Sequence, residues 1–306
     1  MSRVIHTGQA LVDATAEVAG LPERGQNVMA DSWGQAAGGA VNTLVAAARS
    51  GASCVHAGAV GSGHNGDLIR QALAAEDIAC AAPPVEGRDT ALCVVLVEPN
   101  GERTFVTMLG AERDLSVTIL DASRPEPGDL VCVTGYSLAV ASTRLPLERW
   151  LAQLPDGVRV VLDPGAAFAG LPADVRDRML SRTDVWTSNQ EEAEALVGPA
   201  TMTEAAAAVA RLLPRGAVSI VRDGPAGCAV HVDGTTTEVP GFPQTPIDTN
   251  GAGDAHTGVL VAEVAAGTDW VGACRRANIA GAITVTRRGP ATAPTRAEID
   301  AFRPHS

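Results

Sequence analysis

The chain has 306 residues, 46% of them hydrophobic, so it is long enough for one large domain or two modest ones and can fill a sizeable core. A net charge of -12 and the lack of any basic run argue against a nucleic-acid partner, because binding phosphates needs clustered Lys and Arg. No stretch approaches the roughly 20 apolar residues that span a membrane, and the first residues lack the features of a signal peptide. We therefore expect a cytoplasmic protein with no membrane partner.

The chain contains no lysine, so every positively charged side chain is Arg, or His when protonated. This excludes a Walker-type phosphate loop and a Schiff-base lysine. If the protein handles phosphate, it must do so with backbone amides, Arg and metal ions. The six cysteines are far apart, with no CxxC pair, which predicts buried reduced thiols.

Short Val-rich runs alternate with longer Ala- and Leu-rich amphipathic runs, a pattern typical of strands and helices that build a mainly parallel sheet. The expected strands lie at 2–8, 52–60, 129–135, 158–165, 184–189 and 218–224. The expected helices lie at 40–51, 66–77, 145–154, 190–197, 202–213, 253–267 and 270–285.

Two segments interrupt this alternation. Residues 91–109 contain two alternating apolar runs around Asn100-Gly101, a strong signal for a hairpin turn. Residues 10–35 have the pattern of a strand, a turn and a second strand. We expect these two segments to pair as a small sheet outside the main one.

Two glycine-rich places compete as phosphate sites. Gly61, Gly63 and Gly66 form a GxGxxG pattern between an expected strand and helix, which indicates a dinucleotide-dependent oxidoreductase. The next strand should then carry an acidic residue, but residues 80–87 contain a double proline there, a poor centre for a strand. This weakens the dinucleotide interpretation.

The second place is Gly251-Ala252-Gly253, directly before Asp254 and an apolar helix. Adjacent backbone amides at a helix N-terminus attract anions without a cationic side chain, which suits a chain without lysine. We expect the helix dipole to keep Asp254 ionised, so that it could accept a proton from a nearby hydroxyl. The same residues also fit an ordinary capped turn.

Read in order, the motifs resemble those of the PfkB family of carbohydrate kinases, also called ribokinase-like. The resemblance covers nearly the whole chain and rests on these stretches: TGQALVDA, GGAVN at 38–42, GAVGSGHNGDLIRQAL, NQEE at 189–192, RDGPAG and DTNGAGD at 248–254. It implies a three-layer α/β/α sandwich with a mostly parallel central sheet. It further implies one domain over residues 1–306, with a small β-sheet lid at about 10–37 and 89–108.

The resemblance also implies ATP-dependent phosphorylation of a sugar hydroxyl, with Asp254 as the general base and Gly251, Ala252 and Gly253 as the anion hole. The implied sugar-binding residues are Asp13, Gly38, Gly39 and Asn42, with Arg103 of the hairpin as a further candidate. The implied ATP-binding residues are Asn189, Arg222, Gly224, Gly227 and Asn278. Glu192 is implied for Mg²⁺ through water, and Asp248, Asn250 and Gly289 for a monovalent cation such as K⁺.

Several of these residues also have ordinary structural interpretations. Glu192 fits a solvated first-turn carboxylate, Asp13 a turn residue, Asn42 a helix cap, and Arg103 a surface residue of the lid. The chain also departs from the family: GGAVN is shorter than the GGKGAN of ribokinases, which puts ribose in doubt.

Three alternatives to a sugar kinase stay open: a nucleoside kinase of the same family, the oxidoreductase, and a non-catalytic sugar-binding protein. Aromatic residues make up only 3% of the chain, which favours a bare sugar, whereas Trp33 and Phe105 on the expected lid keep the nucleoside possible. An exposed lid edge would also offer a surface for a homodimer.

Overall fold

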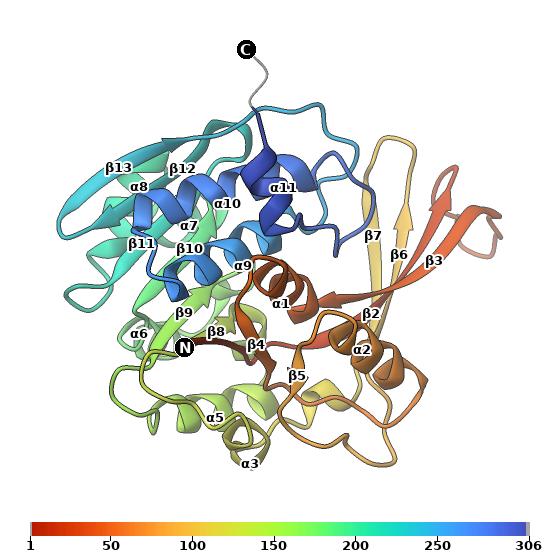
Figure 1. Cartoon of the computed structure of the whole chain (residues 1–306). Helices are drawn as coiled ribbons and strands as arrows, with labels where there is room; N and C mark the ends of the chain where they lie inside the picture. Colours follow the sequence, from red (N-terminus) through yellow and green to blue (C-terminus); the bar gives the residue numbers. More distant parts are fainter. Residues whose placement is uncertain (1, 304–306) are drawn as a thin grey trace.

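The computed structural model describes residues 2–303 and contains two separate sheets (Figure 1). The larger sheet has nine strands in the order β13-β12-β11-β10-β9-β8-β1-β4-β5. All neighbours from β11 to β5 are parallel, whereas β12 and β13 are antiparallel. The strands are β1 (Arg3–His6), β4 (Ser53–His56), β5 (Ala79–Cys80), β8 (Leu130–Thr134), β9 (Arg159–Asp163), β10 (Val185–Asn189), β11 (Val218–Arg222), β12 (Gly227–Val232) and β13 (Thr235–Pro240).

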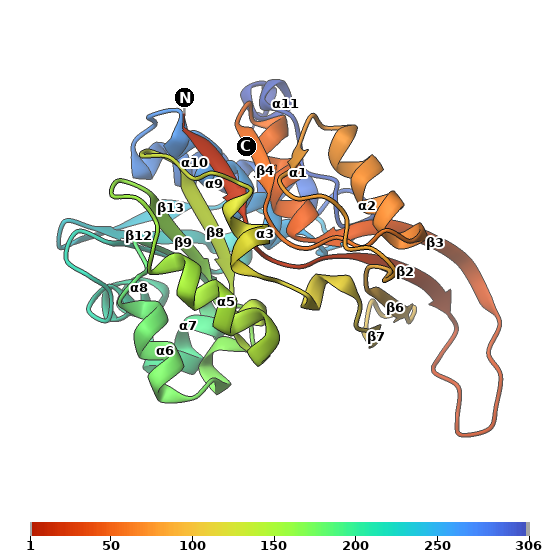
Figure 2. The same cartoon turned by 90° about the horizontal axis from the view of Figure 1, so that it is seen from below.

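Helices cover both faces of this sheet, which gives three layers (Figures 1 and 2). Alternate strand residues enter different cores: Val4 packs on one side and Ile5 on the other. The Val4 side is covered by α1 (Ala40–Arg49), α2 (His64–Ala74), α9 (Ala252–Ala265) and α10 (Trp270–Thr284). The Ile5 side is covered by α5 (Ala141–Leu151), α6 (Ala173–Leu180), α7 (Gln190–Val197) and α8 (Met202–Ala210). The predicted sandwich is therefore confirmed.

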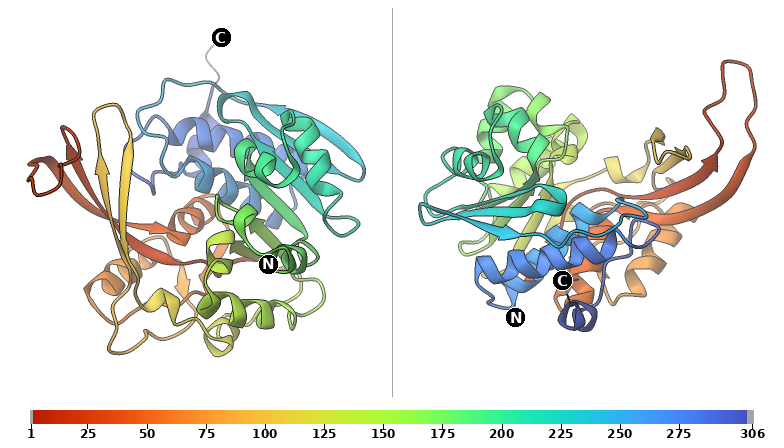
Figure 3. Two further views of the ribbon diagram at one scale, coloured as in Figure 1. Left: turned by 180° about the vertical axis from the view of Figure 1, so that it is seen from behind. Right: turned by 90° about the horizontal axis from the view of Figure 1, so that it is seen from above.

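The smaller sheet is formed by the two segments that interrupt the alternating pattern. It contains β2 (Ala10–Val18), β3 (Ala30–Gly39), β6 (Leu92–Val97) and β7 (Arg103–Met108), in the order β3-β2-β6-β7. The central pair β2 and β6 is parallel, and the two outer pairs are antiparallel hairpins. Figures 2 and 3 show the β2–β3 hairpin projecting from the body of the molecule.

All six expected strands and seven expected helices are present, within a few residues of their predicted bounds. Strands β12 and β13 were not predicted; β12 follows the glycine-rich turn at residues 224–227 and pairs antiparallel with β11 and with the edge strand β13. The short helices α3 (Val117–Asp121), α4 (Gly135–Leu138) and α11 (Arg296–Ala301), as well as α6, were also missed, since so few turns give little periodic signal.

The six cysteines are unpaired, and all except Cys80 are buried, as predicted. Within residues 2–303, none of the helices combines the length and the apolar character needed to cross a bilayer.

Candidate active site

The glycine-rich turn before α9 places Asp254 in the first turn of that helix. Gly251 has a left-handed backbone with φ of 76°, and a Cβ there would overlap the carbonyl oxygen of Pro290. Only glycine therefore fits this position without strain. Helix α9 is buried on nearly all sides between α1 and α10, so its N-terminus is fixed in direction.

Two side chains of α1 contact the Asp254 carboxylate. The Asn42 amide donates to Oδ2 at 3.0 Å, and the Thr43 hydroxyl donates to Oδ1 at 3.4 Å. The first turn of α1 is itself positioned by Gly39, which adopts a φ of 63°, and by the Ala40 amide, which donates to the Gln9 carbonyl at 2.9 Å. The N-termini of two helices therefore meet at one carboxylate.

Burial raises the pKa of Asp254 to about 6, against the opposing effects of its hydrogen bond from Asn42 and the Arg222 charge. The nearby Asp163 carboxylate raises the pKa further. Desolvation therefore outweighs the stabilising effect of the helix dipole on the ionised form. Above pH 6 the carboxylate is still mostly ionised, and a pKa near neutrality suits a general base.

The amides beside Asp254 are open to a ligand. Within residues 2–303, the Gly251 and Gly253 amides have no hydrogen-bond acceptor, and the Ala252 amide makes only a long bond of 3.4 Å to the Thr249 carbonyl. Two of the three donors are therefore available at the positive end of the helix dipole.

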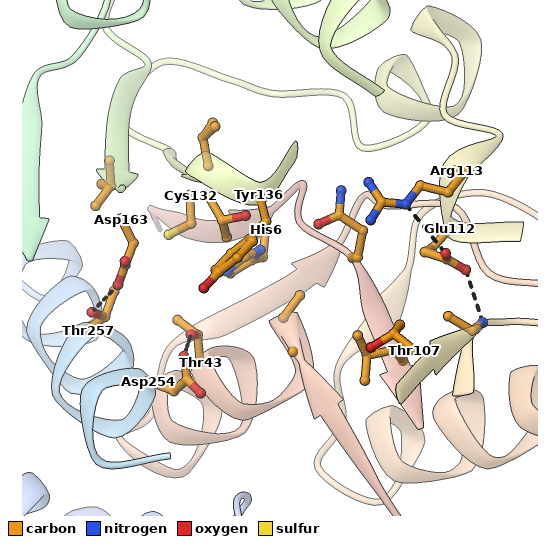
Figure 4. Close-up of a pocket in the computed structure, with 18 of the residues that line it drawn as sticks. His6, Thr43, Thr107, Glu112, Arg113, Cys132, Tyr136, Asp163, Asp254 and Thr257 are labelled. Atoms are coloured by element: carbon orange, nitrogen blue, oxygen red, sulfur yellow. Dashed lines mark hydrogen bonds and ion pairs between the residues drawn. The ribbon is translucent and has the colours of Figure 1, made fainter. Parts of the chain in front are cut away.

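Asp254 faces a cavity of about 480 Å³ between the two sheets (Figure 4). Asp163 and Thr257 lie at the same end, where the Thr257 hydroxyl donates to Asp163 at 3.3 Å. Arg113 and Glu112 lie at the opposite end in this view. The sequence interpretation missed the following lining residues: His6, Thr43, Glu112, Arg113, Asp163 and Thr257. Of these residues, only Asp163 could have been predicted from the sequence, since an acidic residue at the carboxyl end of a parallel strand lies where ligands bind in such sheets.

Asp13 and Gly38 lie opposite each other on β2 and β3. A Cβ on Gly38 would overlap the Asp13 carboxylate, so the glycine makes room for that side chain. The Asp13 carboxylate has no hydrogen-bond partner among residues 2–303, and burial raises its pKa to about 6. Leu11, two residues earlier on the same face of β2, lines the cavity, as does Gly39.

The predicted ATP-binding residues gather at the carboxyl ends of β10 and β11. Asn189 and Arg222 are register partners there, and the Arg222 guanidinium donates to the Gly253 carbonyl at 2.7 Å. Asn189 and Glu192 form a capping box at the start of α7, with bonds of 2.7 and 3.0 Å. Burial, followed by the Asp163 charge, raises the pKa of Glu192.

The other three nucleotide candidates differ in accessibility. Gly224 lies in the exposed turn after β11, with φ of 47°. Gly227 is buried, and a Cβ there would overlap the Val239 carbonyl oxygen. Asn278 is buried, donates to the Val239 carbonyl at 2.9 Å and bonds His256 at 3.1 Å. Asn278 therefore holds β13 against α9 and α10, and its direct contact with a nucleotide stays a prediction.

The predicted monovalent-cation residues surround an arginine side chain. Arg103 of β7 forms an ion pair with Asp248. The same carboxylate also accepts hydrogen bonds from the Asn250 amide at 2.9 Å and the Gly289 amide at 3.0 Å. The guanidinium therefore lies beside the residues named for the monovalent cation, and cation binding there stays a prediction.

At the GxGxxG segment, a carboxylate of the chain itself occupies the place where a phosphate would bind. The Asp89 carboxylate accepts hydrogen bonds from the Asn65 and Gly66 amides at 3.1 and 3.0 Å, at the N-terminus of α2. A Cβ on Gly61 or Gly63 would overlap residues 88–90. This N-terminus already binds an internal anion, so the pyrophosphate of a dinucleotide has no place there.

Comparison with known proteins decides the family. The chain matches the model of the pfkB family of carbohydrate kinases over residues 1–296. The chain belongs to the PfkB family. It is a carbohydrate kinase, which confirms the predicted class of enzyme and removes the oxidoreductase and the non-catalytic protein.

Relatives of this PfkB protein span most of its length. It is 30% identical to the sugar kinase YegV of Escherichia coli strain K12, covering 97% of this chain and 92% of that one. It is also 30% identical to the ATP-dependent ribose-1-phosphate kinase of Halopiger xanaduensis, covering 99% and 98%. The Arabidopsis thaliana ribokinase, solved with ribose and ATP, has the same fold, with a TM-score of 0.79, 22% identity and 98% of each chain covered.

Proposed function

We propose that this kinase transfers the terminal phosphoryl group of ATP to a hydroxyl group of a sugar, with Asp254 as the general base. The supporting observation is that Asp254 faces the cavity beside the unpaired amides of Gly251 and Gly253. Asp254 accepts the hydroxyl proton while the new O–P bond forms and ADP leaves. The amides at the N-terminus of α9 stabilise the charge on the moving phosphoryl group.

Asp13, Gly38, Gly39 and Asn42 form the proposed sugar-binding side. The Asp13 carboxylate is free to accept hydrogen bonds from two hydroxyl groups. The Asn42 amide donates to the Asp254 carboxylate and so orients the base. The buried Oδ1 atom of Asn42 has no partner in residues 2–303, which leaves it for a sugar hydroxyl. The small sheet above them is the proposed lid, which would exclude water from the reaction.

Arg222, Asn189, Gly224 and Gly227 form the proposed ATP side. The donor set suits Mg²⁺ bound through water, because Glu192 and Asp163 bring two carboxylates near the same place and Mg²⁺ keeps several waters. Among residues 2–303, no group of three or more potential metal ligands is preassembled. Bound Mg²⁺ would neutralise charge on the ATP phosphates.

The residues expected for K⁺ do not fit a monovalent cation while Arg103 pairs with Asp248. We infer that the Arg103 guanidinium replaces the cation and ties β7 of the lid to the turn before α9. This would make the kinase independent of K⁺.

A nucleoside acceptor remains the second candidate. Trp33 and Phe105 are 61% and 60% exposed on β3 and β7, so they could stack on a base or meet a second copy of the lid in a homodimer. ATP use and six unpaired thiols fit a cytoplasmic location.

The test is ADP release from MgATP with purified protein and a panel of pentoses, hexoses, sugar phosphates and nucleosides. At least one sugar should stimulate ADP release. Separately, light scattering of the wild-type and Phe105→Ser proteins would test whether the lid forms a homodimer. A panel on which only nucleosides act would favour the second candidate. No acceptor-dependent ADP release at all would contradict the proposed function.

A further inference from the structure

Arg113 brings a positive charge to the end of the cavity opposite Asp254. It follows the Gly110 turn that connects β7 to the body, and its side chain points into the cavity (Figure 4). In the described part of the chain, its Nε and NH1 atoms are buried and have no hydrogen-bond partner. Buried donors without hydrogen bonds are costly, so this arrangement indicates an acceptor that arrives with a ligand.

The adjacent Glu112 does not supply that partner. Its buried carboxylate lies 3.7 Å from Arg113 Nε, so the two form an ion pair, but this distance is beyond that of a hydrogen bond. Both of its oxygens instead accept backbone amides: Oε1 from Gly110 at 2.9 Å, and Oε2 from Ala91 at 3.0 Å. Glu112 therefore closes the start of the loop, and the donors of Arg113 remain available.

His6 adds a neutral donor to the same cavity. Its Nδ1 accepts the Gly8 amide at 3.0 Å, so the ring proton must lie on Nε2. Burial, together with the neighbouring His56, lowers the pKa of His6 to about 3, and the ring stays neutral. Among residues 2–303, its Nε2 has no partner, so it can donate to an oxygen atom of the ligand.

We propose that the acceptor sugar carries an oxyanion group, either a phosphate or a carboxylate, which binds to Arg113, while His6 donates a hydrogen bond to another oxygen of the same ligand. This inference rests on the proposed function and narrows its substrate class. The cavity of about 480 Å³ lies within the range of roughly 300–1,000 Å³ that holds drug-sized ligands, so a sugar with such a substituent fits.

The charge distribution of the cavity also fixes the direction of the acceptor. Two carboxylates, Asp163 and Asp254, repel an oxyanion at one end, whereas the carboxylate of Glu112 at the other end is balanced by the charge of Arg113. An acceptor bound with its anion at Arg113 therefore presents a distant hydroxyl group to Asp254. Phosphorylation should occur at a hydroxyl remote from the charged substituent.

The test compares neutral sugars with their charged counterparts: ribose with ribose 1-phosphate and ribose 5-phosphate, and glucose with gluconate. ADP release at saturating MgATP gives kcat and KM, and calorimetry measures acceptor binding without ATP. The variants are Arg113→Gln and, as a matched control, Arg88→Gln, whose guanidinium pairs with Asp114 at 2.6 Å. The phosphate and gluconate arms identify which oxyanion is bound.

The wild-type enzyme should prefer at least one charged acceptor to its neutral counterpart by kcat/KM. Arg113→Gln should raise KM for that acceptor roughly 10- to 100-fold with a smaller change in kcat, as expected for a lost charge-assisted hydrogen bond. Arg88→Gln should match the wild type. Activity with neutral sugars only, or an equal effect of Arg113→Gln on both classes, would overturn this inference while leaving the kinase function intact.

Discussion

The Asn42 amide donates a hydrogen bond of 3.0 Å to the carboxylate of Asp254, which joins the first turn of α1 to the first turn of α9. These residues are 212 positions apart. The bond holds the carboxylate toward the cavity rather than toward bulk solvent. The predicted chemistry depends on this orientation, because a base acts only within hydrogen-bond reach of its proton.

The acceptor kcat/KM should rise with pH between about 5 and 7. Burial raises the pKa of both Asp13 and Asp254 to about 6, and each is proposed to work in its ionised form, so activity is lost as pH falls through 6. Initial rates at saturating MgATP, measured from pH 5 to 9, test this. Asp13→Asn should lower kcat/KM and make the increase of kcat/KM with pH less steep, because only Asp254 then titrates. A flat profile over this range would contradict the assignment.

Asp254→Asn should stabilise the protein without ligands at pH 8. The pKa of Asp254 in the folded state is raised above its usual value of 3.8, so the ionised carboxylate costs stability above pH 6, and this cost disappears below pH 4. We expect a gain of about 1–2 kcal/mol at pH 8, discounted for partial exposure, and none at pH 4. Urea unfolding of Asp254→Asn and of the exposed Asp67→Asn measures the difference. A destabilised Asp254→Asn at pH 8 would contradict the account.

Gly38→Ala should weaken acceptor binding. The new Cβ would overlap the Asp13 carboxylate and displace it. Loss of its hydrogen bonds to the sugar should raise KM for the acceptor roughly 10- to 100-fold. Gly34→Ala is the matched control: Gly34 lies on the same strand, and a Cβ there would have no atom within 4 Å. Equal KM values for the two variants would remove Asp13 from the sugar site.

Arg103→Gln should convert a K⁺-independent enzyme into a K⁺-dependent one. Removing the guanidinium leaves Asp248 with only the amides of Asn250 and Gly289, a place where a monovalent cation could then bind. Steady-state rates in potassium and in tetramethylammonium salts test this. Arg288→Gln serves as the control, since Arg288 pairs with the exposed Glu17 nearby. Wild-type activity that requires K⁺ would contradict the replacement.

Elements could be predicted from the sequence where the pattern that specifies them lies within a few neighbouring residues. Strands β1, β4, β8, β9, β10 and β11 are short apolar runs that end at the same sheet edge, and the Asn100-Gly101 turn marks the β6–β7 hairpin. Gly251 and Asp254 could be placed because a positive φ and a helix start both have sequence preferences.

Contacts between distant segments could not be predicted in this way. Arg103 and Asp248 are 145 positions apart, and their ion pair depends on how the small sheet lies over the turn before α9. Arg113 has no motif of its own, and its position in the cavity follows from the loop after β7. The raised pKa of Asp254 could not be predicted for a similar reason, because its burial arises from packing between distant segments.

Transfer of labelled phosphate from the terminal position of ATP to an acceptor, compared between the wild type and Asp254→Asn, tests the central claim most directly. The account predicts a labelled sugar product with the wild type and a kcat roughly 10² to 10⁴ lower for Asp254→Asn, with ATP binding retained. A variant that forms the product at the wild-type rate would contradict Asp254 as the base.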